Sequence, residues 1–256
     1  MKAQAAAAAS TIQFDLQAVS VRFGAREALK NVDLQIAQGD RLALIGANGS
    51  GKSTLLRVLH GLISSTSGQA GQMSGCFHLH EDVRQAMLFQ RPHMLRMSAQ
   101  ANVAMAAWLG GTPWALAKAQ ALAALQRVGL AGEARRPARA LSQGQQQRLA
   151  LARAWVMQPN VLLLDEPTAS MDPHAKREVE HLMQEFATFA DPGSGQAMTL
   201  IFASHNLGQV KRLATHVAYL EHGQLLVHLP VDVFFDSACL QAVSTQADAF
   251  LKGDFV

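Results

Sequence analysis

Three glycines, a lysine and three hydroxyl residues lie together in LIGANGSGKSTLLRVL, residues 44–59. In the pattern Gly46-x-x-x-x-Gly51-Lys52-Ser53, glycine lets the backbone wrap closely and aim N–H groups at phosphate oxygens. A helix that begins near Gly51 adds the positive end of its dipole. A lysine at this place reaches the β- and γ-phosphates, and the serine hydroxyl can bind Mg²⁺. The spacing therefore predicts a site for a nucleoside triphosphate and Mg²⁺.

Polar side chains also end several apolar runs further along the chain. In VLLLDEP an apolar run is followed by Asp165, which can hold Mg²⁺ through water, and then by Glu166, which can take a proton from an attacking water. His205 ends TLIFASH and suits a donor to the γ-phosphate, whereas Gln90 ends MLFQ and suits the orientation of water or metal. Each residue alone is also compatible with an ordinary strand terminus. The phosphate loop upstream is what favours a functional interpretation.

The elements that must position these residues follow an α/β pattern. Alternating runs predict half-exposed strands at residues 14–23 and 29–37, and residues 64–75 are predicted as a turn-rich segment. Alanine- and leucine-rich helix occupies about 98–158, with breaks at LGGTP and GLAGEARRPA. Short apolar runs predict buried strands at 40–46, 86–90, 160–166 and 198–204. Helices from Pro173 and near Asn206 and a hairpin at LEHGQLL follow.

Composition excludes several classes of protein. The 256 residues are 49% apolar, and a net charge of +3 fits a solvated surface better than a nucleic-acid site. Cys76 and Cys239 lack the spacing of a metal or redox site, so buried or unreactive thiols in a reducing compartment are expected. No apolar run approaches the ~20 residues that cross a bilayer, and the start lacks a signal-peptide core. A cytoplasmic chain that reaches a membrane only through a partner is expected.

LSQGQQQRLALARA, residues 141–154, places Ser142 and Gly144 before a long helix, as a second anion site or simply as a helix cap. Taken in order, GANGSGKST, FQRP, LSQGQ, VLLLDEP, ASMD and SH resemble the motifs of the ATP-binding cassette (ABC) ATPases over about residues 12–230. The resemblance implies an α/β fold: a P-loop NTPase core of ABC-ATPase type, with an N-terminal antiparallel β-subdomain and an α-helical subdomain inserted at about 98–158. Residues 1–11 are expected to form a disordered leader, and residues 231–256 a short helical tail.

In that family two cassettes pair head to tail, and each ATP lies between one phosphate loop and the signature of the opposite subunit. The resemblance makes Glu166 the catalytic base, His205 the switch histidine and Gln90 the link to a membrane partner. Phe23 stands where a tyrosine often stacks on adenine, and Gln143 stands where glycine is commonest. Ala169–Asp172 is expected to touch the twin site. The implied metal ligands are Ser53, Gln90 and Asp165. The implied ATP contacts are Phe23, Gly46, Ala47, Asn48, Gly49, Ser50, Gly51, Lys52, Ser53, Thr54, Ser142, Gly144 and Gln145.

The cargo rests on resemblance alone. Residues 87–103, 149–173 and 234–256 are similar to the tungstate importer ATPases, near relatives of the phosphate and polar amino-acid importers. The short tail after Pro230 argues against sugar and many molybdate importers, whose ATPases often carry an added C-terminal β-domain. The implied partners are a second copy of the chain, an integral membrane permease and a periplasmic or extracellular substrate-binding protein, with no nucleic acid. The chain is then peripheral on the cytoplasmic face of the inner (plasma) membrane.

Two other functions remain as alternatives. A soluble ABC ATPase that acts on DNA or ribosomes usually has paired cassettes, coiled-coil insertions or zinc cysteines, which this sequence lacks. A P-loop switch or small-molecule kinase leaves LSQGQQQR unexplained, and the guanine-reading N-K-x-D of a GTPase is absent. After Gln90, the residues Met94, Leu95 and Met97 suit either an exposed contact with a helix of another protein or the core of the helical lobe.

Overall fold

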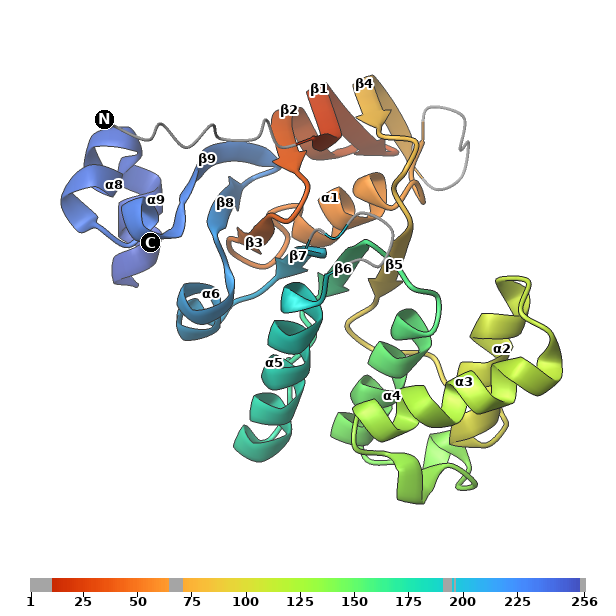
Figure 1. Cartoon of the computed structure of the whole chain (residues 1–256). Helices are drawn as coiled ribbons and strands as arrows, with labels where there is room; N and C mark the ends of the chain where they lie inside the picture. The colour runs from red at the N-terminus through yellow and green to blue at the C-terminus, as the bar shows by residue number, and fades with distance from the viewer. Residues whose placement is uncertain (1–10, 65–70, 191–194, 196, 254–256) are drawn as a thin grey trace, which may run out of the picture.

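The structure is a computed structural model that describes residues 11–64, 71–190, 195 and 197–253. It contains a three-stranded antiparallel sheet of order β2-β1-β4 and a six-stranded sheet of order β5-β6-β7-β3-β8-β9 (Figure 1). The strands of the smaller sheet are β1 (Ile12–Phe23), β2 (Arg26–Ala37) and β4 (Gln72–Leu79). Those of the larger sheet are β3 (Arg41–Ile45), β5 (Gln85–Leu88), β6 (Val161–Asp165), β7 (Thr199–Ala203), β8 (His216–Glu221) and β9 (Gln224–Pro230). The predicted leader lies almost wholly in residues 1–10, outside the described part of the chain.

A bulge in β1 keeps apolar side chains on the buried face of the antiparallel sheet. Phe14 and Leu16 point inward before it, and Val19 and Val21 after it, so the alternation skips one residue. Ala18 takes φ +50° at the bulge. Opposite it on β4, a Cβ at Gly75 would lie 2.4 Å from the Ala18 carbonyl oxygen, so glycine lets the two backbones approach.

The strand β4 corrects the prediction of a turn-rich segment at residues 64–75. Its first four residues, Gln72–Gly75, lie within that segment. Serine and glycine have weak intrinsic strand preference there, and pairing with β1 decides the conformation.

The larger sheet brings the ends of separate chain segments to one edge. Its strands β5, β6, β7, β3 and β8 run parallel, and only β9 is antiparallel to its neighbour. In such sheets ligands bind beyond the carboxyl ends of the strands. The residues that follow β3, β5, β6 and β7 therefore meet at that edge.

Helices cover both faces of this sheet. The helix α1 (Lys52–Leu59) lies between the two sheets (Figure 1). Its Leu55 and Leu59 belong to the same core cluster as Leu163 of β6. Leu162 and Leu164 point to the opposite face and pack with α5 (Pro173–Thr188) and α6 (Leu207–Leu213). Because both faces of the sheet are buried, the strands have unbroken apolar runs in the sequence instead of alternating apolar and polar residues.

A helical lobe projects from the sheet between β5 and β6 (Figure 1). Its helices are α2 (Ala99–Leu109), α3 (Trp114–Arg127) and α4 (Gln143–Trp155), with single 3₁₀ turns at Ala131–Glu133 and Ala138–Ala140. Met94 is 4% exposed and belongs to the lobe core, so the interpretation of this residue as an exposed contact for another helix is wrong. Leu95 and Met97 are half-buried.

The described chain ends in short helices that pack on the larger sheet. They are α7 (Val231–Phe234), α8 (Ser237–Val243) and α9 (Thr245–Lys252). Phe234 is fully buried, and the Phe250 ring lies 4.9 Å from the ring of Tyr219 on β8. Cys76 and Cys239 are free and exposed, which rules out buried thiols and leaves the other expected alternative, unreactive thiols. Within the described ranges, no helix has the length and apolar character to span a membrane.

Candidate functional site

Residues 46–51 form a tight loop between β3 and α1 that only glycine permits at two places. A Cβ at Gly46 would lie 2.1 Å from the carbonyl oxygen of Leu220, and φ is +142° there. A Cβ at Gly51 would lie 2.9 Å from the carbonyl oxygen of Ala28, at φ +111°. The loop is therefore clamped between the end of β8 and the hairpin of the antiparallel sheet.

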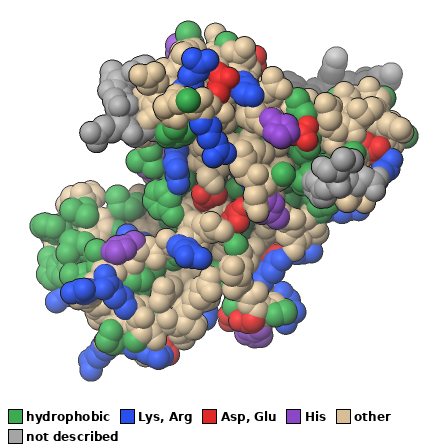
Figure 2. Space-filling model, turned by 180° about the vertical axis from the view of Figure 1, so that it is seen from behind, with side chains coloured by type: hydrophobic (Ala, Val, Ile, Leu, Met, Phe, Trp, Pro, Cys, Tyr) green, Lys and Arg blue, Asp and Glu red, His purple; other side chains and the backbone are tan. Residues whose placement is uncertain are grey.

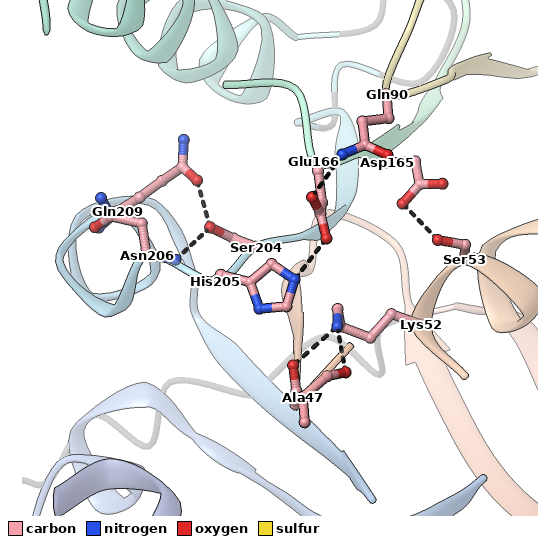
Figure 3. A network of polar contacts seen from close by, with 11 residues as sticks. Ala47, Lys52, Ser53, Gln90, Asp165, Glu166, Ser204, His205, Asn206 and Gln209 are labelled. Atoms are coloured by element: carbon pink, nitrogen blue, oxygen red, sulfur yellow. Dashed lines mark hydrogen bonds and ion pairs between the residues drawn. The ribbon is translucent and has the colours of Figure 1, made fainter. Parts of the chain in front are cut away.

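Lys52 places a buried positive charge inside this loop. Its side chain is 5% exposed, and Nζ donates to the carbonyl oxygens of Gly46 at 2.8 Å and Ala47 at 3.0 Å (Figure 3). Burial lowers the pKa of Lys52, whereas the charges of Glu166 and Asp165 raise it. The ammonium group thus donates to two carbonyl oxygens of the loop and has a third N–H with which it can bind an anion.

The first turn of α1 has donors that suit phosphate oxygens. Its N-cap, Gly51, has no side chain to accept from the first N–H groups of the helix. The hydroxyl of Ser50 is buried, and it has no hydrogen-bond partner among the described residues. A phosphate in the loop would satisfy these groups and meet the positive end of the helix dipole, so the residues present fit a nucleotide.

Asp165 and Ser53 bring hard oxygen donors to one point beside the loop. The Ser53 hydroxyl donates to Asp165 Oδ1 at 2.9 Å (Figure 3). Burial raises the pKa of Asp165, and the hydroxyl hydrogen bond opposes that shift. The described residues form no cluster of three or more histidine, cysteine or acidic side chains that could hold a metal. A carboxylate and a hydroxyl are oxygen donors of the kind that Mg²⁺ takes, and Mg²⁺ keeps waters and phosphate oxygens among its other ligands, so the Ser53–Asp165 pair fits this ion.

Glu166 is held at both carboxylate oxygens by residues from two other strand ends. His205 Nε2, after β7, lies 2.6 Å from Oε1, and Gln90 Nε2, after β5, lies 3.0 Å from Oε2 (Figure 3). The Glu166 backbone has φ +46°, a left-handed conformation that is strained for a residue with a side chain. This backbone conformation goes with a side chain that lines the same cavity as the phosphate loop.

A cavity of about 420 Å³ opens between the loop, the antiparallel sheet and Glu166. Phe23 lines it at the end of β1, 38% exposed. A Cβ at Gly71 would lie 2.8 Å from Phe23 Cε1, so the ring edge rests against that glycine. Gln90 lies on the cavity wall as well. The predicted aromatic, phosphate and metal residues of one chain are thus brought together.

Arg26 is a cavity residue that the sequence interpretation missed. It begins β2, and its Nη2 would lie 3.4 Å from a Cβ built at Gly49. A lone arginine in a hairpin carries no sequence signal. Its position follows only from the way the antiparallel sheet folds over the loop.

The residues around Ser142 lie apart from this cavity. Ser142, Gly144 and Gln145 are absent from its lining and form the start of α4. The exposed Ser142 hydroxyl accepts from the Gln145 N–H, and Gln145 Oε1 accepts from the Ser142 N–H, a complete capping box.

Gly144 has a packing reason of its own, because a Cβ there would lie 2.8 Å from the Cβ of Ala175 on α5. Gln143 Nε2 donates to the carbonyl oxygen of Ala169 at 3.5 Å and so links the start of α4 to the loop after Glu166.

A buried polar network behind the site also escaped the sequence interpretation. Gln209 on α6 is fully buried; it accepts from the Ser204 hydroxyl at 2.6 Å and donates to Thr168 Oγ1 at 3.1 Å. The loops that carry His205 and Glu166 are thereby joined through Gln209, and Figure 3 shows the Ser204 side of this link. Serine, threonine and glutamine at these places have no distinctive spacing, so no pattern could have indicated the network.

Comparisons with known proteins agree on one family. A family profile described as "ABC transporter" matches residues 29–169. The aliphatic sulfonates import ATP-binding protein SsuB 3 of Pseudomonas syringae pv. tomato is 38% identical over 227 residues, 87% of this chain and 78% of the relative. The nickel import ATP-binding protein NikO of Rhodobacter capsulatus is 36% identical over 84% of this chain and 88% of the relative. The glutamine transport ATP-binding protein GlnQ of Escherichia coli is 35% identical over 81% and 87%.

Solved structures share the fold. The protein cbiO1 from Clostridium perfringens, part of the ABC transporter complex cbiONQ, aligns with a TM-score of 0.73 at 24% identity, covering 94% of this chain and 99% of that one. The ATP-binding cassette MJ0796, solved as a dimer in a post-hydrolysis state with ADP and Pi, aligns with a TM-score of 0.71 at 24% identity, over 85% and 98%.

Proposed function

The chain belongs to the ABC transporter family, and from this premise we propose that it energises the uptake of an oxyanion, with tungstate as the first candidate. As a family member it is an ATPase of importer type that uses ATP with Mg²⁺. One observation carries the proposal: Lys52, the Ser53–Asp165 pair and the doubly held Glu166 surround one cavity.

Each of these groups has a distinct task in the proposed reaction. Lys52 and the N–H groups of α1 hold the phosphates, and Ser53 and Asp165 hold Mg²⁺. Glu166 takes the proton of the attacking water. Each carboxylate oxygen of Glu166 accepts one contact, from His205 or from Gln90, and keeps a second lone pair for the proton. His205 and Gln90 are thereby placed beside the γ-phosphate and the water, which they can orient.

The cassette is proposed to work as a head-to-tail pair. Support comes from Ser142, which is exposed and absent from the cavity of its own chain, at a capped helix start that suits an anion. In the pair, Ser142, Gly144 and Gln145 close on the γ-phosphate held by the partner, and Phe23 stacks on adenine from the same side as the phosphate loop. The pair then lies on the cytoplasmic face of the membrane, bound to an integral permease that receives cargo from a separate substrate-binding protein.

The proposed cargo follows from resemblance of residues 87–103, 149–173 and 234–256 to the tungstate importer ATPases. A relative named for sulfonate import also handles an oxyanion, which supports that chemical class. Relatives named for nickel and for glutamine have nearly the same identity, 36% and 35%, so overall identity does not separate cargoes. The cargo contacts the permease and the binding protein, which explains why the cassette residues say little about it.

Uptake in a strain that lacks this chain tests the proposal. Loss of tungstate accumulation, restored by the chain but not by the Glu166→Gln variant, is the expected result. Unchanged tungstate accumulation with loss of sulfonate, nickel, phosphate or amino-acid uptake would replace the cargo and leave the ATPase in place.

A further inference from the structure

The turn between α2 and α3 carries an exposed apolar surface at the outer end of the helical lobe. We call residues 108–116 the tryptophan turn; its Trp108, Leu109, Trp114 and Leu116 are 50%, 73%, 38% and 52% exposed. The two indole rings meet edge to face, with centroids 6.5 Å apart. Figure 2 shows hydrophobic side chains gathered on this part of the lobe. The function proposed above uses none of these residues.

Along the sequence, the charged residues on either side of the turn are all basic. No acidic residue occurs between Asp82 and Glu133, and residues 108–116 carry no charge. Lysine and arginine do occur in that stretch, at Arg84, Arg91, Arg96, Lys118 and Arg127. The ammonium group of Lys118 lies 5.6 Å from the centre of the Trp114 ring, directly beside the turn. The surface therefore complements an anionic partner.

The backbone N–H groups between α2 and α3 are already hydrogen-bonded within the chain. The N–H groups of Gly110, Gly111 and Thr112 donate to carbonyl oxygens at the end of α2, at 3.0–3.1 Å, and Pro113 has no N–H. Entry into an apolar phase therefore leaves no unpaired backbone donor at residues 110–113, between the two helices. Because Pro113 gives α3 no side-chain cap, the first N–H groups of that helix suit headgroup phosphate oxygens.

We propose that the tryptophan turn binds the anionic surface of a lipid bilayer. Tryptophan rings favour the headgroup level, where their apolar faces are buried and the indole N–H stays hydrated. An uncharged tip enters that level without burying a charge, and Lys118 remains beside acidic headgroups. The proposal relies on the proposed function only to place a membrane beside the chain.

Tryptophan emission reports on this turn with little background. The chain has three tryptophans, and the third, Trp155, packs 4.4 Å from Phe186 and under the guanidinium of Arg127 at 4.2 Å. Trp155→Phe leaves Trp108 and Trp114 as the emitters. Vesicles of equal parts phosphatidylethanolamine and phosphatidylglycerol should shift the emission to shorter wavelength, with quenching by brominated acyl chains and weakening by salt. Phosphatidylcholine vesicles should give a much smaller shift.

Flotation of the otherwise unchanged chain with the same vesicles guards against misfolding of that variant. The triple variant Trp108→Ser, Leu109→Ser, Trp114→Ser should lose about tenfold in bound protein while its ATP turnover is unchanged. The control pair Leu62→Ser and Val243→Ser removes exposed apolar side chains elsewhere and should bind as before.

Absence of vesicle binding by the full chain, or equal loss in the control, would overturn the proposal. So would protection of the turn only in a detergent-solubilised complex with the permease, which would make the occupant a protein. Vesicle binding needs no ATP, so failure of the ATPase assignment would be seen separately, in turnover.

Discussion

Lys52 joins the loop and the carboxylates through a single buried charge. It donates to two carbonyl oxygens of its own loop while two carboxylates raise its pKa against the effect of burial. A phosphate that enters the loop gains a charge already placed and largely stripped of water, which makes the interaction stronger than at the surface. ATP affinity should depend on this charge and not on the basic character of α1 in general.

Replacement of Lys52 by alanine tests that dependence. Loss of a charge-assisted hydrogen bond should weaken ATP binding by about 1.5–3 kcal/mol. Arg57→Ala removes an exposed positive charge from the same helix and should leave ATP affinity nearly unchanged. Calorimetric titration of both variants with ATP decides the matter, because equal losses would reduce the role of Lys52 to general charge.

Phe23 lines the cavity at a place where its ring can stack on adenine, a role that the sequence alone could only suggest. Phe23→Ala should cost on the order of 1 kcal/mol in ATP affinity, whereas Phe23→Tyr should be nearly neutral, because both rings stack through the same face. Phe89→Ala is the matched control, an exposed phenylalanine that does not line the cavity. Equal nucleotide affinity in the alanine and tyrosine variants would remove Phe23 from the adenine site.

Among individual residues, the sequence correctly placed those whose position in the site depends only on local spacing. Gly46, Lys52 and Asp165 lie where strand, loop and helix patterns place them. Arg26 could not be found in this way, because the fold of the hairpin over the loop brings it to the cavity. The contact of His205 with Glu166, at 2.6 Å, likewise joins strand ends about forty residues apart in sequence.

The helix α4 serves two purposes at its start, and these can be separated. Ser142 caps α4 in the same way that Ser98 caps α2, each hydroxyl accepting from the N–H three residues on. Ser142→Ala and Ser98→Ala should each lower the free energy of unfolding by about 1 kcal/mol. Only Ser142→Ala should also lower ATP turnover, if this hydroxyl closes on the nucleotide of the partner. Equal turnover in the two variants would leave Ser142 a helix cap alone.

The loops after β6 and β7 depend on α6 through Gln209. Gln209→Leu leaves Ser204 and Thr168 without their partner and should cost about 1–3 kcal/mol of stability. The turnover number should fall more than the KM for ATP rises, because His205 and Glu166 lose their mutual position. Val210→Ala, the neighbouring buried residue of α6, is the control. A similar fall in turnover there would make the effect one of stability.

Element prediction succeeded where apolar periodicity was strong and failed where pairing decided the structure. The strands β3, β6 and β7 are short, fully buried runs, and the hairpin of β8 and β9 has His222-Gly223 at its turn. The strand β4 has little burial and begins among serine and glycine, so only its ladder with β1 makes it a strand. Met94 shows the opposite limit, because burial in the lobe depends on helices that lie elsewhere in the sequence.

For the whole molecule, the position of the signature relative to the cavity explains why one copy is incomplete. The phosphate loop and Glu166 line one cavity, and Asp165 is hydrogen-bonded to Ser53 of that lining, while Ser142 lies at the start of a helix outside it. Six motifs in their order could indicate this architecture, since together they resemble the motifs of the ABC ATPases. The cargo could not be read in the same way, because no cassette residue is expected to touch it.

The central claim is that Glu166 drives hydrolysis of an ATP enclosed by two copies of the chain. Glu166→Gln keeps the size of the side chain and its neighbours His205 and Gln90 but removes the base. Light scattering after size exclusion, together with ATP turnover, measures both parts of the claim in one sample. The variant should bind ATP, lose nearly all turnover and have the mass of a dimer only when ATP and Mg²⁺ are present. Turnover equal to that of the unaltered chain, or a monomer at saturating ATP, would contradict the claim.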